Sequence, residues 1–220
     1  MKDLAARFLS EADQQKIEAC VQEAEQRTRG EIVVMAVSAS YHYPTASLLG
    51  ATAFSFPIAI ALTPLLGGLV WTGPSNMWIF LGALIPLFLA FHEAVKRIRF
   101  LKKLFISGKE MEAEVQEAAA IQFYRKGFYR TREETGVLIY ISIFEHKVWV
   151  LGDRGINAKI PEEYWKGIVH IIVRAIQEGR PAEGICQAVS KLSVLLEEKF
   201  PVRPGDKNEL KNLMVGNESS

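Results

Sequence analysis

Apolar residues follow two different spacings along this chain, and one long central segment carries no charge. Outside that segment, apolar residues recur at helical spacing in some stretches and form short continuous runs in others. The helical stretches are 10–30, 108–126, 161–179 and 181–200, and the runs typical of buried strands are 31–37, 137–143 and 147–151. The pattern therefore predicts an α/β fold with an apolar insertion.

The order of these elements predicts helices packed on both faces of one small mixed sheet. The helix over 108–126 can act as the crossover between the strands at 31–37 and 137–143, which makes those two strands parallel. The gap Phe144–His146 is short enough for a hairpin turn, so the strand at 147–151 should be antiparallel to its neighbour.

We therefore expect one αβα sandwich, split in the sequence and interrupted by the apolar insertion. The domain should comprise residues 1–43 and 104–201, with the insertion at 44–103 and a tail at 202–220. The tail ends in small and polar residues, Gly216 to Ser220, and is expected to fray.

The insertion has the length and composition of a transmembrane helical hairpin. From Ile32 to His92 the chain contains no Lys, Arg, Asp or Glu over 61 residues. Ser47–Trp71 and Asn76–His92 form two apolar runs, and about 20 residues cross the hydrocarbon core as a helix. The second run spans if its helix continues through Glu93–Val95. A buried hairpin of a soluble fold needs far fewer uncharged residues, so we expect the lipid bilayer to be a partner.

Small residues recur at every fourth position of the first apolar run. Ser47, Ala51, Ser55 and Ala59 form a stripe along which another helix can approach closely. That helix could be the second helix of the same hairpin. It could equally belong to another copy of the chain or to another membrane protein.

Basic residues near the membrane predict the orientation. The connection between the two apolar runs has none. Five follow the second run, namely Lys96, Arg97, Arg99, Lys102 and Lys103. This asymmetry places both polar flanks in the cytoplasm, in an inner (cytoplasmic) membrane protein. The same cluster could bind anionic lipid headgroups, but topology is the simpler interpretation.

The polar N-terminus lacks an apolar signal-peptide segment, so we expect no cleavage.

Charge and cysteine content exclude several other classes. The net charge is only +1, and basic and aromatic residues do not interleave along any face, so we expect no nucleic-acid partner. Cys20 and Cys186 lie beside apolar residues of expected helices. We interpret both as small buried thiols rather than as a disulfide, a metal site or a nucleophile.

Candidate chemistry is concentrated after the last strand. The common nucleotide-binding, metalloprotease and serine-hydrolase motifs are absent, so catalytic residues stay unassigned. Gly152–Gly155 follows that strand, where Asp153 could bind a divalent cation and Arg154 could bind a phosphate. The alternative is a tight turn with a surface Asp–Arg pair.

Other polar residues give weaker signals. Glu31 is expected at the opposite edge of the sheet as a solvated strand start, and the segment 206–210 is expected to cap a helix rather than to bind a cation. The four histidines are His42, His92, His146 and His170. None has a second His or a carboxylate at the spacing of a metal site.

Four segments together resemble the TPM domain. They are Phe8–Ser10, Thr28–Val34, Glu134–Tyr140 and Asp153–Ile156, in this order. The family includes the thylakoid-lumen photosystem repair phosphatase, cyanobacterial Psb-type relatives and a nematode acetylcholine-receptor modulator. The resemblance implies an αβα sandwich, often tethered to a membrane, and in this chain a subgroup with an inserted hairpin. It also implies weak acid phosphatase activity and binding of calcium or magnesium in some members, and accessory roles in others.

These observations leave two hypotheses for function. The first is a membrane-anchored binding or accessory module for the assembly or maintenance of membrane proteins. The second is a weak metal-dependent acid phosphatase. By the resemblance, Asp153 occupies the acidic position after the third strand and would bind the cation, while Arg154 would hold the phosphate.

Overall fold

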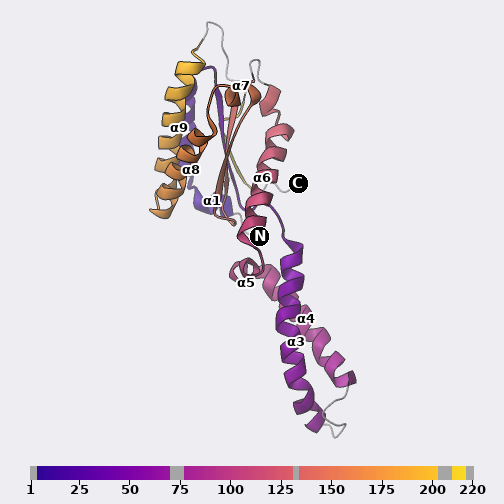
Figure 1. Ribbon diagram of the computed structural model, residues 1–220. Coiled ribbons are helices and arrows are strands. Elements are labelled where there is room, and N and C mark those ends of the chain that lie inside the picture. Colours follow the sequence, from indigo (N-terminus) through magenta and orange to yellow (C-terminus); the bar gives the residue numbers. More distant parts are fainter. Residues whose placement is uncertain (1–3, 70–76, 131–133, 203–209, 217–220) are drawn as a thin grey trace. The chain divides into compact units, whose positions relative to one another are not determined.

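The computed structural model describes residues 4–69, 77–130, 134–202 and 210–216. The chain divides into two compact units, which are described separately below. One unit comprises Met1–Tyr41 and Glu112–Ser220, and the other comprises His42–Met111. Figure 1 shows the helices and strands of both units.

The first unit is built on a four-stranded mixed sheet in the order β3-β2-β1-β4. The strands are β1 (Glu31–Val37), β2 (Gly136–Ser142), β3 (Lys147–Gly152) and β4 (Leu213–Gly216). β1 is parallel to β2, and β3 is antiparallel to β2, which confirms the expected pairing.

The fourth strand corrects the expectation that the whole tail frays. β4 pairs in parallel with the second half of β1, from Val34↔Leu213 to Val37↔Gly216. Four residues are too few for a periodicity signal, even though Asn212 and Gly216 bound the apolar run at Leu213–Val215. Pairing with β1 supplies the stability that the segment lacks by itself.

Helices cover both faces of the sheet and make an αβα sandwich (Figure 1). α2 (Glu11–Glu25), α8 (Glu162–Gln177) and α9 (Pro181–Lys199) pack on one face, and α6 (Gly108–Arg125) packs on the other. Alternate residues of β1 belong to the two cores: Ile32, Val34 and Ala36 to one, and Val33, Met35 and Val37 to the other. Burial on both faces explains why β1 is a continuous apolar run.

Short helices connect the main elements. They are α1 (Leu4–Phe8), α5 (Arg99–Leu104), α7 (Arg154–Asn157) and a 3₁₀ turn at Phe128–Arg130. The sequence pattern did not predict them, because four to six residues give less than two helical turns. By contrast, α2 begins at the expected N-cap. The Ser10 hydroxyl accepts a hydrogen bond from the Asp13 amide, and the Asp13 carboxylate accepts one from the Ser10 amide.

The packing of α8 against α9 requires a glycine. A Cβ at Gly184 would lie 2.2 Å from the Ala175 Cβ, so no other residue fits without moving one helix. Ile185 and Leu192 of α9 are completely buried in the core that these helices share with the sheet.

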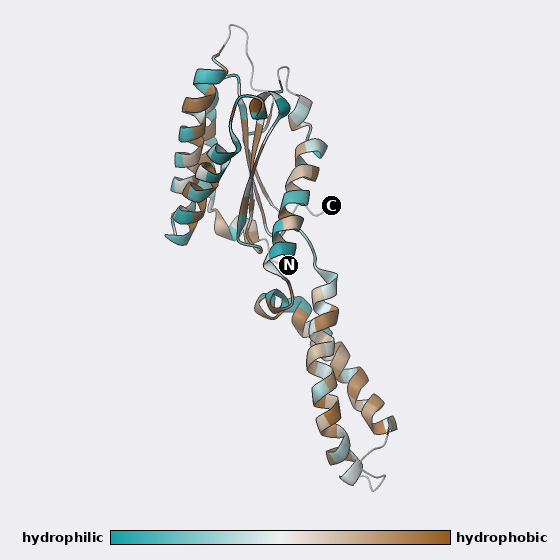
Figure 2. Cartoon of the chain, viewed as in Figure 1, coloured by the Kyte–Doolittle hydropathy of each residue, from teal (hydrophilic) through white to brown (hydrophobic). Residues whose placement is uncertain are grey.

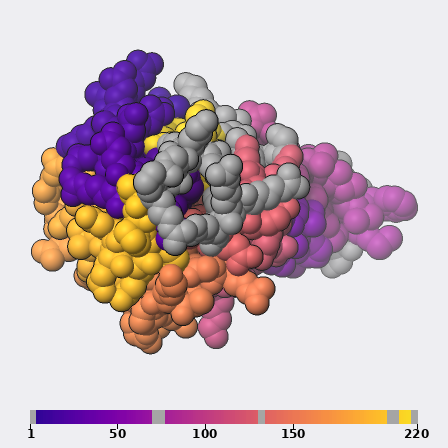
Figure 3. All heavy atoms as spheres, turned by 90° about the horizontal axis from the view of Figure 1, so that it is seen from above, coloured from indigo at the N-terminus to yellow at the C-terminus, as the bar shows by residue number. Residues whose placement is uncertain are grey.

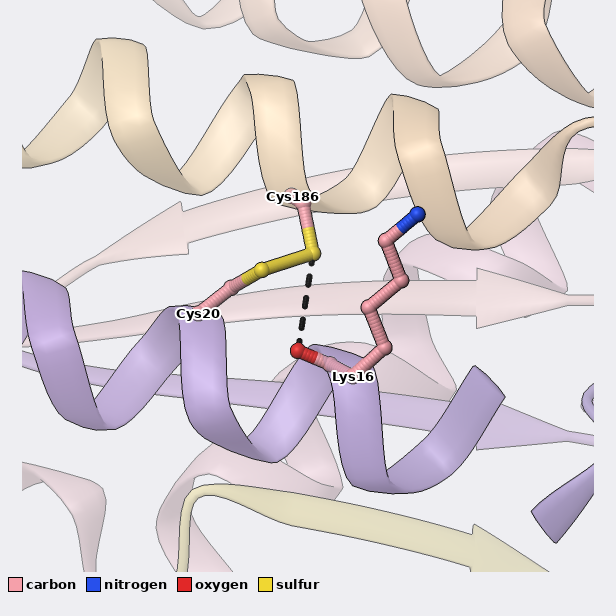
Figure 4. The surroundings of a disulfide bond; sticks show 3 residues. All are labelled: Lys16, Cys20 and Cys186. Carbon is pink, nitrogen blue, oxygen red and sulfur yellow. Dashed lines mark hydrogen bonds between the residues drawn. A yellow bond between two sulfur atoms is a disulfide. The ribbon is translucent and has the colours of Figure 1, made fainter. Parts of the chain in front are cut away.

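The first unit contains a disulfide, so the interpretation of Cys20 and Cys186 as unbridged thiols is wrong. Cys20 of α2 and Cys186 of α9 are bonded, with their Cα atoms 5.6 Å apart (Figure 4). The Cys186 sulfur also lies 3.7 Å from the carbonyl oxygen of Lys16. Both cysteines are only half-buried. The helices that carry them, α2 and α9, pack side by side (Figure 3). The sequence could not show this, because 166 positions separate them and only the tertiary packing brings them together.

The second unit is a helical hairpin of α3 (Pro44–Leu69) and α4 (Met77–Arg97). Both helices are long enough and apolar enough to cross a bilayer. α4 continues past His92 through Glu93–Val95, as the second span requires. Figure 2, coloured by hydropathy, shows hydrophobic residues along both helices. Large apolar side chains of both helices are exposed, namely those of Leu49, Ile60, Leu65, Leu69, Met77, Trp78, Ile85 and Leu89.

The small-residue stripe of α3 is buried within the hairpin. Ser47, Ala51, Ser55 and Ala59 are each at most 4% exposed, and α3 packs along α4. The second helix of the same chain is therefore the neighbour that the stripe meets. Another protein that contacts the hairpin would meet its exposed apolar faces.

Aromatic side chains complete the contact between the two helices. The rings of Phe54 and Phe91 are 5.5 Å apart, and Phe105 meets Phe54 edge-on at 5.7 Å. A Cβ at Gly50 would lie 3.0 Å from both Phe105 and Val95, so this glycine lets the segment after α5 reach α3.

Glu25 connects three elements of the first unit at the end of α2. Its Oε1 accepts a hydrogen bond from the Ile32 amide at 3.0 Å, and its Oε2 accepts one from Asn212 Nδ2 at 2.8 Å. Burial raises the pKa of Glu25 to about 7, the negative charge of Glu31 adds to the rise, and the two hydrogen bonds oppose it. This carboxyl thus takes up a proton near neutral pH.

The raised pKa predicts how stability depends on pH. Because the folded state holds the Glu25 proton more tightly than the unfolded state, stability should fall as the pH rises from about 4.5 to about 7 and then level off. Glu25→Gln should remove most of this slope. Thermal unfolding of both proteins between these pH values tests the expectation, and identical slopes for the wild type and the variant would contradict it.

Candidate functional site

The topology brings the starts of β1 and β2 and the end of β3 to one edge of the sheet. Glu31 pairs with Gly136, and Val137 pairs with Gly152. The Glu31 amide donates to the Thr135 carbonyl at 3.1 Å, and the Asp153 amide donates to the Gly136 carbonyl at 2.8 Å. Asp153 therefore lies at the amino-terminal edge of the parallel strands.

This arrangement corrects the expectation for Glu31. Glu31 starts β1 at the same edge as Asp153, because β3 runs antiparallel to β2 and its end returns to the start of β2. Glu31 is also buried, at 8% exposure, and not solvated. The expectation was wrong because it placed Asp153 at the carboxyl ends of the parallel strands, whereas the end of the antiparallel strand β3 lies beside the start of β2.

Two glycines at this edge leave room for neighbouring groups, a backbone carbonyl beside Gly136 and side chains beside Gly152. A Cβ at Gly136 would lie 2.5 Å from the Phe128 carbonyl oxygen. A Cβ at Gly152 would lie 2.8 Å from an Ile156 methyl group and 3.1 Å from the Trp165 ring. These contacts explain why glycine occupies both positions, the one before Val137 and the one before Asp153.

Asp153 caps a short helix and keeps one carboxylate oxygen without a hydrogen bond. It is the N-cap of α7, and its Oδ1 accepts from the Arg154 amide at 2.7 Å. Its Oδ2 is buried and has no hydrogen-bond partner among the described residues. Burial raises the pKa of Asp153, the Arg154 hydrogen bond opposes the rise, and the charge of Glu134 adds to it. A cation or a proton donor at Oδ2 would relieve this unfavourable burial.

Arg154 contacts Asp153 through its backbone amide. The Arg154 side chain is exposed, and within the described parts of the chain it forms no ion pair with Asp153. The alternative expectation was a tight turn with a surface Asp–Arg pair. Asp153 does lie at a turn into a helix, but its side chain does not pair with that of Arg154. The cation-binding and phosphate-binding roles stay predictions.

A complete metal site is not assembled by the residues that the structure describes. Across them, no three His, Cys, Asp or Glu side chains come together in an arrangement suited to a metal ion. Residues 206–209 of the segment 206–210, considered above as a cap or a source of oxygen ligands, lie outside the described ranges. Asp153 and Glu134 are two carboxylates that could hold a cation. Glu31 is a third acidic residue at the same edge.

The sequence analysis missed a second polar cluster at the opposite edge of the sheet. Glu145 is 4% exposed, and its carboxylate accepts hydrogen bonds from the Ser40 amide at 3.0 Å and from the Ser142 hydroxyl. The Ser40 hydroxyl donates to the Ser142 hydroxyl at 2.9 Å and lies 3.3 Å from the Tyr140 hydroxyl.

This cluster connects the segment after β1 to the turn between β2 and β3. Both oxygens of Glu145 have donors, so the group is satisfied as a structural element. The sequence carries little signal for it, since Ser40 and Glu145 are 105 positions apart. The sequence predicted the turn itself at Phe144–His146, and the structure adds the positive φ of 55° at His146.

Comparisons with known proteins bear on this fold. The family model of the TPM domain matches residues 102–195. A search of curated proteins gave no match. Among solved structures, the NMR structure of BA42 protein from the psychrophilic bacterium Bizionia argentinensis sp. nov. is similar, with a TM-score of 0.58 and 18% sequence identity over 94% of each chain.

The structural similarity supports the fold, and the family match supports the resemblance of the sequence motifs. The matched range contains β2, β3 and the Asp153 turn, while the motifs at Phe8–Ser10 and Thr28–Val34 precede it. This chain therefore matches the TPM domain family over residues 102–195, within an α/β fold that it shares with BA42 protein.

Proposed function

We propose that this chain is a membrane-anchored TPM domain with a hairpin inserted between β1 and β2, and that it binds other membrane proteins to support their assembly or maintenance. The observation that carries the proposal is the exposed apolar surface of α3 and α4 in a hairpin whose small residues are already buried. Because the hairpin is inserted within one sheet-forming domain, a hairpin in the bilayer would tether that domain to the membrane.

Membrane proteins can contact this hairpin only through faces that lipid also covers. Phe56 and Ile60 are exposed on α3, and Ile85 and Leu89 are exposed on α4, whereas Ala59 is fully buried. Packing between membrane helices relies on close van der Waals contact. A stable partner should therefore exclude lipid from at least one of these faces.

Site-specific photo-crosslinking tests for that partner. We expect benzoylphenylalanine at Ile60 or Leu89 to give discrete protein adducts in intact membranes, and the same probe at the buried Ala59 to give none between chains. Adducts are identified by mass spectrometry. Adducts to lipid alone, at both Ile60 and Leu89, would contradict a protein-binding role for the hairpin.

A phosphatase is the second candidate, and the buried Oδ2 of Asp153 favours it. The oxygen has no hydrogen-bond partner among the described residues and lies at the turn that carries the exposed Arg154. A divalent cation held by Asp153 would polarise a phosphoryl oxygen, and Arg154 would hold the same phosphate through paired hydrogen bonds. Glu134 is the acidic neighbour that could share the cation, since its charge raises the pKa of Asp153.

Hydrolysis of p-nitrophenyl phosphate with calcium or magnesium tests this second function. Asp153→Asn and Arg154→Ala should each lower metal-dependent turnover by about a hundredfold, while Glu197→Gln, an exposed acid on α9, should not change it. Because the pKa of Asp153 is raised, protonation should displace the cation and activity should fall as the solution becomes acidic. Equal activity in all variants would remove Asp153 from the site.

We further propose that the domain lies on the cytoplasmic side of an inner membrane. Lys96 and Arg97 end α4 and Arg99 follows it, and such residues set the orientation when the helices insert. The Cys20–Cys186 disulfide is more typical of an oxidising compartment, but cysteines do not direct insertion. In this orientation the pair would be reduced in growing cells and would form the disulfide on oxidation.

Cysteine labelling tests the orientation and the redox state together. In a Cys20→Ser/Cys186→Ser background, an impermeant maleimide should label Ser75→Cys in intact cells and Ser190→Cys only after permeabilisation. In the wild type, acid-quenched cells should give free Cys20 and Cys186. Labelling of Ser190→Cys in intact cells, with an oxidised wild-type pair, would place the domain outside the cytoplasm.

A further inference from the structure

A groove runs along the outer edge of β3. Its volume is about 760 Å³, and it lies between α6 and α8. Val148 and Val150 of β3 line it together with Val115 of α6 and Trp165 and Val169 of α8. The centre of the groove is therefore apolar on both sides of the strand.

The backbone of β3 faces this groove with unused hydrogen-bonding groups. In an antiparallel pair, alternate residues direct their amide and carbonyl groups to the partner strand. The Asp153 amide donates to Gly136, so Trp149 and Leu151 share this direction toward β2. Val148 and Val150 consequently direct theirs toward the groove, and no other described part of the chain hydrogen-bonds them.

On the other side of the sheet, β4 is the outer strand and covers part of β1. β4, a short extended segment, pairs with β1 from Val34 to Val37. The sheet thus already binds one four-residue strand through main-chain hydrogen bonds at one edge, while β3 ends it at the other.

Charged residues limit where pairing can occur on β3. Lys147 begins the strand and forms an ion pair with Glu112 of α6 at 3.1 Å. Lys166 and Glu162 form a second pair on α8 beside the groove, at 3.6 Å. A charged residue at an edge discourages unspecific sheet association, which leaves the apolar stretch from Val148 to Leu151 as the region for a specific partner.

We propose that the β3 groove binds an extended segment of a partner protein, which adds to the sheet as a fifth strand beside β3. The unpaired main-chain groups of Val148 and Val150 identify the occupant as another extended backbone. Its side chains should be apolar on both faces, since Val115 lies on one side and Trp165 and Val169 on the other. This inference rests on the proposed role as a binding module and names the kind of segment that the module binds.

Selection of peptides on the full-length protein in detergent tests the proposal. A phage library of random dodecapeptides is the probe, and enriched sequences are synthesised for titration. Val169→Glu places a charge in the groove, and the matched control Val194→Glu adds the same charge at a 62% exposed position of α9. We expect Val169→Glu to weaken binding by about tenfold or more, and Val194→Glu to leave it unchanged.

A second change tests the main-chain contact directly. Val150→Pro removes the amide that faces the groove and should also weaken binding. If that variant does not fold, N-methylation of alternate peptide amides tests the same hydrogen bonds without altering the protein. Binding that survives N-methylation at every position would overturn strand addition.

Two further outcomes would overturn the proposal. One is a selection that enriches no sequence on the wild type over the Val169→Glu variant. The other is a concentration-dependent dimer that Val169→Glu dissociates, which would make a second copy of the chain the occupant. Groove binding without crosslinks from the hairpin would contradict only the membrane-partner role, so the two proposals can fail separately.

Discussion

Parallel pairing of β1 with β2 is the constraint on which the rest of this structure depends. Both strands are buried on both faces, so each requires a layer of helix on either side. Parallel strands also need a long crossover, and here that crossover holds the hairpin as well as α6. The hairpin is thus inserted where the fold already needs a long connection, and it leaves the register between Glu31 and Gly136 intact.

The antiparallel return of β3 then decides where the polar groups lie. It carries Asp153 back to the starts of β1 and β2, beside Glu31, and it leaves Glu145 at the opposite edge. The two carboxylates differ in their surroundings. Glu145 is fully hydrogen-bonded, whereas one oxygen of Asp153 is buried without a partner among the described residues. A buried oxygen without a hydrogen bond is unfavourable. A ligand would therefore stabilise Asp153, whereas Glu145 has no need of one.

The two sides of the sheet, beyond β1 and beyond β3, also differ in their backbone hydrogen bonding. β4 satisfies the backbone of β1 at one edge, and the charged pair Lys147–Glu112 protects only one end of β3 at the other. An edge strand that pairs with no described part of the chain can pair with other chains, so the free side of β3 is consistent with a module that binds partners. The similarity to BA42 protein, at 18% identity, concerns the fold and leaves the use of either edge to be decided from this chain.

The sequence by itself determined the main helices, the first three strands, their relative directions and the two apolar helices. These follow from local spacing and burial, as in the continuous run Glu31–Val37 and the N-cap at Ser10. It also identified Asp153 as the residue to examine. Only the tertiary structure decided that Cys20 meets Cys186, that Glu31 shares an edge with Asp153, that Glu25 bridges Ile32 and Asn212, and that Leu213–Gly216 forms a strand. Each of these contacts joins residues whose meeting depends on how whole elements pack, and no local pattern encodes that packing.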